Sequence, residues 1–144
     1  MKKQVVALSL ILAVGAVLAQ ATTPVGLWKT IDDETKAEKS LVRIVDVGGV
    51  LTGRVERIFE ADKQTSVCEK CTDERVGKPV LSMTIIRNAK RDADKGVWEG
   101  GDILDPNNGK VYRLRLKPGE GGSTLEVRGY IGPFFRNQKW LRVE

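Results

Sequence analysis

The chain has 144 residues, with 24 Lys or Arg against 19 Asp or Glu and a formal net charge of +5. It contains no histidine, which removes the commonest general base, the commonest metal ligand and any Ser-His or Cys-His nucleophile pair. Basic and acidic residues are interspersed without a long basic run, a pattern typical of a mixed solvated surface rather than of a nucleic-acid-binding face.

The first 21 residues have the pattern of an export signal. Lys2 and Lys3 form a short basic start, residues 5–18 are almost entirely apolar, and residues 19–21 read Ala-Gln-Ala, a small-x-small cleavage site. The apolar run is short for a membrane span, so a retained anchor is the less favoured alternative. We expect a signal peptide at 1–21, cleaved after Ala21 or else after Ala19. The mature domain, 22–144, would be periplasmic or secreted, without stable membrane insertion.

Eight short segments of the mature chain have the alternation, or the β-branched and aromatic content, of β-strands. They are residues 26–32, 40–47, 50–59, 80–87, 97–104, 111–117, 124–131 and 138–143. Turn signals separate them, among them Gly48-Gly49, the Asp-Pro-Asn-Asn-Gly run at 105–109 and Gly132-Pro133. Within the third segment, Gly53 indicates a bend or a close backbone approach. Asn88 to Gly96 is charged and turn-like.

Sequential strands with short connections predict an all-β fold. An eight-stranded antiparallel up-and-down barrel is the simplest closure, because it removes both exposed sheet edges. A β-sandwich is the alternative. A barrel of about eight strands is either filled by side chains or has room for one small ligand.

Cys68 and Cys71 form the only cysteine motif, Cys-Glu-Lys-Cys. A zinc site would need two further ligands without any histidine or second cysteine pair. Covalent haem attachment would need histidine where Thr72 stands. The flanks lack the strand and helix start of a thioredoxin-like redox site. After export, a structural disulfide that pins a loop is the favoured interpretation, and a redox function is the alternative.

The carboxylates offer little organised chemistry. Asp102 and Asp105, beside Asn107 and Asn108, carry oxygens that calcium could use, but the spacing is not that of an EF-hand loop. The same residues are already explained as a turn, which we favour. Catalysis by Asp102 or Glu99 would need a substrate pocket, and no matched acid–base pair is identifiable. We therefore expect no enzyme activity, no metal and no cofactor.

Gly26-Leu27-Trp28 in the first predicted strand, with Arg142 in the last, resembles the lipocalin and calycin signature. In that superfamily the Gly-x-Trp closes one barrel end, and an arginine of the last strand packs over the indole, an arrangement that suits cation–π stacking.

A wider pattern looks like the domain of unknown function 2147 family of small exported bacterial proteins. It comprises Gly-Leu-Trp-Lys-Thr (26–30), Gly-Val-Leu-Thr-Gly-Arg-Val (49–55), the Cys-x-x-Cys, residues 98–112, Leu-Glu-Val-Arg-Gly-Tyr-Ile-Gly (125–132) and Trp-Leu-Arg (140–142). The resemblance covers essentially all of the mature chain. It implies a lipocalin-like β-barrel in the periplasm or outside the cell, and it implies no established reaction. Residues 132–137 depart from the Gly-Arg-Thr run of the family, so ligand preference could differ if this corner lines the barrel mouth.

The fold, the export signal and the missing catalytic set favour a non-catalytic binding protein that holds a small, partly apolar molecule in the barrel lumen. The candidate ligand-binding residues are Trp28, Trp98, Leu114 and Val127 as wall or floor. Arg54 or Asp102 would orient the ligand if either points inward.

The alternative is a cell-envelope interaction module that binds a protein or glycan through its outer surface. Arg128 and Tyr130 lie on the strand face opposite Leu125 and Val127 and so face outward. Phe134 and Phe135 are adjacent, and adjacent residues of a strand cannot both point inward. The candidate contact patch is Arg128, Tyr130, Phe134 and Phe135, although packing is the favoured role of the phenylalanine pair.

Overall fold

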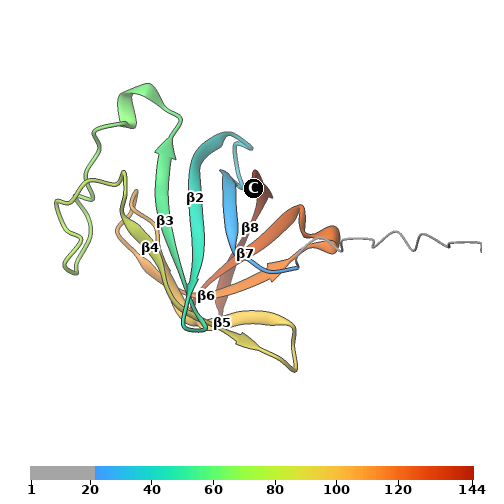
Figure 1. Cartoon of the computed structure of the whole chain (residues 1–144). Helices are drawn as coiled ribbons and strands as arrows, with labels where there is room; N and C mark the ends of the chain where they lie inside the picture. Colours follow the sequence, from blue (N-terminus) through green and yellow to red (C-terminus); the bar gives the residue numbers. More distant parts are fainter. Residues whose placement is uncertain (1–21) are drawn as a thin grey trace, which may run out of the picture.

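The computed structural model describes residues 22–144, whose eight antiparallel strands close into a barrel (Figure 1). The strands are β1 (Gly26–Ile31), β2 (Glu38–Val47), β3 (Val50–Ile58), β4 (Thr84–Asp92), β5 (Val97–Leu104), β6 (Val111–Pro118), β7 (Thr124–Ile131) and β8 (Phe134–Arg142). Each strand pairs with its neighbour in sequence, and β8 returns to pair with β1. The predicted up-and-down barrel is confirmed and the sandwich is wrong. The predicted signal peptide and its cleavage sites lie outside the described residues.

Two predicted strands were misplaced, while the other six match to within two residues. Residues 80–83 belong to a loop, and β4 instead continues through Asn88 to Asp92. Lys90 and Arg91 are exposed to solvent although they belong to a strand, while Ala89 is fully buried. β8 begins at Phe134 rather than 138, because Gly132-Pro133 forms a tight turn that pairs Ile131 with Phe134.

A bulge in β4 increases the number of apolar side chains in the lumen. Gly53 pairs with Ile86 while Arg54 pairs with Thr84, so Ile85 is an extra residue in the ladder. Both isoleucines are buried. A Cβ at Gly53 would lie 2.9 Å from the Ile86 side chain, which confirms the close backbone approach predicted there.

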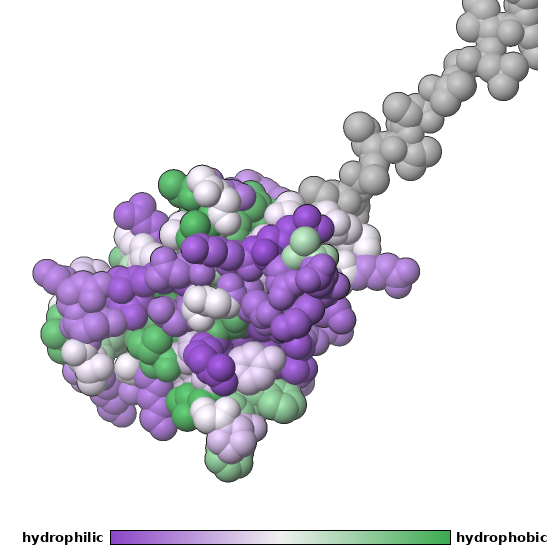
Figure 2. All heavy atoms as spheres, turned by 90° about the horizontal axis from the view of Figure 1, so that it is seen from below, coloured by the Kyte–Doolittle hydropathy of each residue, from purple (hydrophilic) through white to green (hydrophobic). Residues whose placement is uncertain are grey.

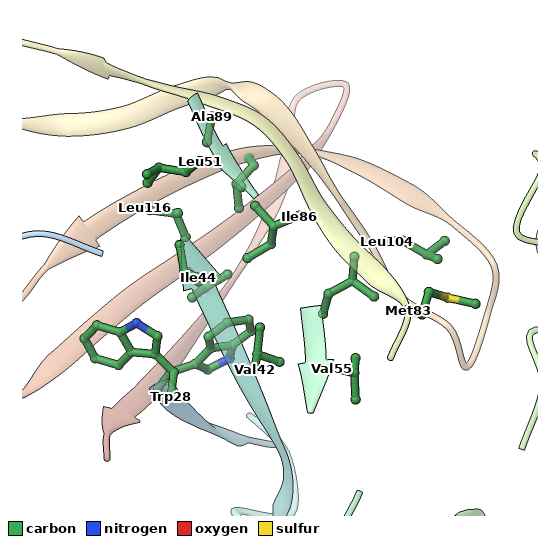
Figure 3. Packing of buried hydrophobic residues seen from close by; sticks show 14 of the residues in the cluster. Trp28, Val42, Ile44, Leu51, Val55, Met83, Ile86, Ala89, Leu104 and Leu116 are labelled. Carbon is green, nitrogen blue, oxygen red and sulfur yellow. The ribbon is translucent and has the colours of Figure 1, made fainter. Parts of the chain in front are cut away.

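The buried core lies inside the barrel and extends from Trp28 to Met83 and Leu104 (Figure 3). Its largest fully buried side chains include Trp28, Ile44, Leu51, Ile86, Leu116 and Leu125. The outer surface is mixed, and the face in Figure 2 is mostly hydrophilic with small separate apolar patches. No helix within residues 22–144 is long and apolar enough to cross a membrane.

One barrel end, which we call the closed end, is sealed by the first and last strands. The Arg142 guanidinium lies 4.2 Å from the centroid of the Trp28 ring, as the lipocalin-like signature implies. The same guanidinium donates to the carbonyl oxygens of Val25 (2.8 Å) and Thr23 (2.6 Å) and to that of Gly122. The Trp28 indole N–H donates to the Pro24 carbonyl at 2.7 Å. These hydrogen bonds satisfy the Arg142 guanidinium and the Trp28 indole N–H at a partly buried barrel end.

The opposite, open end carries the longest connection, residues 59–83, which folds beside the β5–β6 turn (Figure 1). Cys68 and Cys71 form the predicted disulfide, and both residues are buried. Cys68 Sγ lies 3.6 Å from the Pro106 carbonyl oxygen, and the Lys70-Cys71 backbone lies directly against Gly109. The disulfide therefore shapes a loop that packs on the turn.

An ion pair between the buried Arg75 and the partly exposed Asp73 holds the same loop to the barrel. Arg75 is almost fully buried, and its guanidinium donates to both Asp73 carboxylate oxygens and, at 3.0 Å, to the Thr84 carbonyl in β4. These hydrogen bonds from Arg75 lower the pKa of Asp73 to about 2. The carboxylate therefore stays ionised at any ordinary pH.

Acid should loosen this loop. Because the folded-state pKa of Asp73 lies below its value of about 3.8 in the unfolded chain, its stabilisation is complete above pH 4 and is lost as the pH falls towards 2. We expect Asp73→Asn to be less stable at pH 5 and to lose less stability than the parent between pH 4 and 2. Urea unfolding at each pH measures this, with Asp62→Asn as the control. Parallel pH profiles for the parent and Asp73→Asn would contradict it.

Candidate functional site

The barrel contains a cavity of about 370 Å³ at its open end. Its lining comes from β1, β2, β4 to β8, the β1–β2 loop and the β5–β6 turn. It divides into an apolar floor, made by Ile85, Ile103, Tyr112, Val127 and Trp140, and a polar rim, made by Asp32, Glu34, Lys39, Asp105, Asn107, Arg136 and Gln138.

Strand alternation positions the floor. Val127 pairs with Gln138, and Trp140 pairs with Leu125, so all four side chains lie on the inner face of β7 and β8. Trp140 is only 2% exposed, and its indole N–H donates to Gln138 Oε1 at 2.9 Å. That bond lets the polar edge of the ring be buried at little cost.

Gly129 makes room for the one tyrosine of the floor. It pairs with Leu114 across β6 and β7, and a Cβ at Gly129 would lie 3.0 Å from the Cβ of Tyr112. The Tyr112 hydroxyl accepts a hydrogen bond from the Asn108 side-chain amide at 3.0 Å. The ring is thus held between the small residue and the β5–β6 turn, with part of its surface on the cavity.

The two cations of the rim are already paired. Lys39 Nζ lies 2.6 Å from Glu60 Oε1, and Arg136 donates through two nitrogens to the carboxylate of Asp33. The hydrogen bond with Glu60 raises the pKa of Lys39, and the one with Asp33 raises the pKa of Arg136. Both carboxylate partners lie outside the cavity lining.

Three rim carboxylates have no cationic partner within residues 22–144. Asp32 Oδ1 accepts from the backbone N–H groups of Glu34 and Thr35 and from the Thr35 hydroxyl, which lowers the pKa of Asp32. Asp105 Oδ1 accepts only from the Asn107 backbone N–H, at 2.9 Å. Glu34 makes no side-chain hydrogen bond in this part of the chain. The rim therefore carries three carboxylates outside any salt bridge of residues 22–144, with Lys39 near Asp32 and Arg136 near Glu34 only at longer range.

Of the predicted ligand-binding residues, only Val127 lines the cavity. Trp28 and Leu114 are packed into the core, and Trp98 packs against the core with the Arg91 guanidinium 5.9 Å from its ring centroid. Arg54 is exposed and donates to the Ser82 carbonyl at 2.8 Å. Asp102 lies opposite Arg87 and Arg113 in the strand ladder, on the face of β5 away from the cavity-lining Ile103, and its Oδ1 is buried without a hydrogen-bond partner within residues 22–144. Neither of the two orienting candidates meets the condition of pointing inward.

The four residues of the predicted contact patch do not lie on one face of the barrel wall. Arg128, Tyr130 and Phe135 lie together outside the barrel, with the Arg128 guanidinium 4.4 Å from the Phe135 ring centroid and the two aromatic rings 6.0 Å apart. Phe134 lies on the opposite strand face at the rim and is 77% exposed, against 55% for Phe135. The expectation that the two phenylalanines are packed is wrong, because β8 starts at the turn itself and extends past the core.

Sequence reasoning missed most of the cavity, namely Asp32, Glu34, Lys39, Ile85, Tyr112, Arg136 and Trp140. Tyr112 is two residues before the buried Leu114 and so lies on the same face of β6, a signal that could have identified it. For the rim, the signal is weaker: every rim charge lies within three residues of a strand end at one side of the barrel. In residues 22–144 no group of three or more cysteine, aspartate or glutamate residues is arranged to hold a metal ion.

Comparison with known proteins agrees with this architecture. A solved structure described as "Protein HP1028 from the human pathogen Helicobacter pylori belongs to the lipocalin family" aligns with a TM-score of 0.73 at 13% identity, over 86% of this chain and 85% of that one. This likeness concerns the fold alone. No curated protein matches the chain. The family DUF2147, described as uncharacterized protein conserved in bacteria, matches residues 26–142, and the chain therefore belongs to this family.

Proposed function

We propose that the protein is a non-catalytic binding protein that holds a small, partly apolar molecule in the cavity at the open end of the barrel. The observation that carries the proposal is the cavity itself: about 370 Å³, closed below by the core and open at the rim. Ligand pockets in proteins fall in this size range and combine apolar walls with a few polar groups. The lipocalin-like fold supports the same function.

The proposal includes export to the periplasm or the exterior. The signal-like pattern of residues 1–21 and the Cys68–Cys71 disulfide support it, since disulfides persist in oxidising compartments.

Filling the cavity should weaken ligand binding. We expect the neutral fluorophore N-phenyl-1-naphthylamine to bind the parent, and Val127→Phe to weaken its binding by about tenfold or more, a loss of about 1.4 kcal/mol. Val111→Phe is the matched control, because Val111 lies on β6 with its side chain exposed. Fluorescence titration measures both, after circular dichroism has shown that each variant is folded. Equal affinity of the probe for the two variants would mean that the probe does not bind in the cavity, and would contradict the prediction.

A second candidate function is an envelope interaction module that binds a protein or glycan through the outer face of β7 and β8. The observation that favours it is the exposed cluster of Arg128, Tyr130 and Phe135. The same titration separates the two, because a protein that acts only through its outer face has no reason to respond to a substitution at Val127.

A further inference from the structure

The geometry points to an organic cation as the ligand: a molecule with an apolar or aromatic body and an ammonium head. This inference rests on the proposed function and adds the charge class of the ligand. It depends on two independent features of the cavity, namely its aromatic rings and its charge balance.

The aromatic rings of the cavity differ from those elsewhere in the molecule. Outside the cavity, every tryptophan and tyrosine of residues 22–144 has a guanidinium near its ring: Arg142 over Trp28, Arg91 over Trp98, and both Arg113 and Arg128 over Tyr130. The two that line the cavity, Tyr112 and Trp140, have none in this part of the chain. A cation from outside the protein is attracted to such a ring face, most strongly where water is excluded.

The balance of charged groups around the cavity also favours a positively charged ligand. Asp33 and Glu60, which do not line the cavity, neutralise Arg136 and Lys39. The carboxylates of Asp32, Glu34 and Asp105 on the rim form no salt bridge within residues 22–144, although Lys39 and Arg136 act on Asp32 and Glu34 at longer range. Asp32 and Asp105 each use one oxygen on local backbone N–H groups, and their second oxygens are unbonded within residues 22–144.

The two features lie at different depths, which matches an amphipathic cation. Trp140 and Val127 are almost fully buried at the floor, whereas Glu34 is exposed at the rim. An apolar body on the floor would leave the ammonium head between the Tyr112 ring and the rim carboxylates. An anion of the same shape would face those carboxylates with both neighbouring cations already paired, so its binding would be opposed by like charge.

Three probes with one naphthalene body and different charge test the inference. They are 1-naphthylmethylamine, a cation at pH 7, neutral 1-naphthalenemethanol, and the anion 1-naphthoate, each titrated into the intact protein by calorimetry. We expect the cation to bind about tenfold more tightly than the anion, the effect of two or three half-exposed ion pairs. The affinity of the neutral probe should lie between those of the cation and the anion. Added salt should reduce the differences in affinity, because it screens the charges of the rim.

A double variant locates the preference. Glu34→Gln with Asp105→Asn keeps side-chain shape and the oxygen that accepts from Asn107, and should reduce the ratio of cation to anion affinity to about threefold or less. Glu120→Gln, at the closed end, is the control and should leave the ratio unchanged. Equal or tighter binding of the anion, or a ratio unaffected by the double variant, would overturn the inference while the proposed function stands. Failure of all three probes to bind would reject the proposed function, and this inference with it.

Discussion

Replacing Arg142 by methionine is expected to lower the free energy of unfolding by about 3 kcal/mol or more, because it leaves several buried acceptors without a donor. The guanidinium donates to the backbone carbonyls of Thr23, Val25 and Gly122 at the closed end. It also covers the Trp28 ring at 4.2 Å. Methionine restores part of the apolar cover but none of the hydrogen bonds. Burial lowers the pKa of Arg142, which reflects the same desolvation.

Arg57→Met is the matched control. Arg57 also lies over an aromatic ring, 5.6 Å from the centroid of Phe59, but it is exposed and donates no hydrogen bond within residues 22–144. Its replacement should change the free energy of unfolding by about 0.5 kcal/mol or less, as is usual for surface sites. Urea unfolding followed by tryptophan fluorescence compares the two. Similar losses in both variants would mean that the closed end is held by strand pairing rather than by Arg142.

Substituting Gly109 by alanine is expected to detach the disulfide loop from the β5–β6 turn. Gly109 has φ of +71°, which costs an L-residue about 1 kcal/mol. A Cβ there would also lie 2.8 Å from the Cys71 backbone nitrogen and closer still to the Lys70 carbonyl. Because these contacts are with backbone atoms, no flexible side chain can move aside to relieve the clash. Because Asp105, Pro106 and Asn107 of this turn line the cavity, the substitution should weaken probe binding as well as stability.

Gly96→Ala separates steric contact from backbone strain. Gly96 lies in the β4–β5 hairpin with φ of +65°, and a Cβ there would have no neighbour within 4 Å. We expect Gly96→Ala to lose about 1 kcal/mol, from strain alone, and Gly109→Ala to lose about 2–4 kcal/mol, the additional loss coming from the clash. Hydrogen exchange of the Cys68 and Gly77 amides, which are bonded within the loop, should accelerate only in Gly109→Ala. Equal effects of the two substitutions would show that the loop does not depend on the turn.

The two barrel ends differ in chemistry, and the cavity described above lies at the open end. At the closed end Arg142 stacks on the Trp28 ring and donates to nearby carbonyls, and the Trp28 indole N–H donates to the Pro24 carbonyl. At the open end the strands of the β7–β8 hairpin extend past the core, and the loops around them carry charge rather than apolar bulk. The cavity lies at the open end, between the apolar core and these charged loops.

The amino-acid sequence by itself determined the strand pattern, the order of pairing and the contact of Arg142 with Trp28. These depend on local alternation, on turn residues such as Gly48-Gly49, and on a short signature. The polar residues after 87 led to the wrong prediction that β4 ends there. Lys90 and Arg91 are exposed to solvent in a strand, as they would be in a loop.

Only the tertiary structure decided which inward-facing residues border empty space. Leu114 and Val127 follow the same alternation, yet Leu114 is packed into the core while Val127 lines the cavity. Likewise, Lys39 and Arg136 become unavailable to a ligand only because folding brings Glu60 and Asp33 beside them from distant parts of the chain. Alternation is a property of neighbouring residues, whereas volume and charge balance are sums over all eight strands.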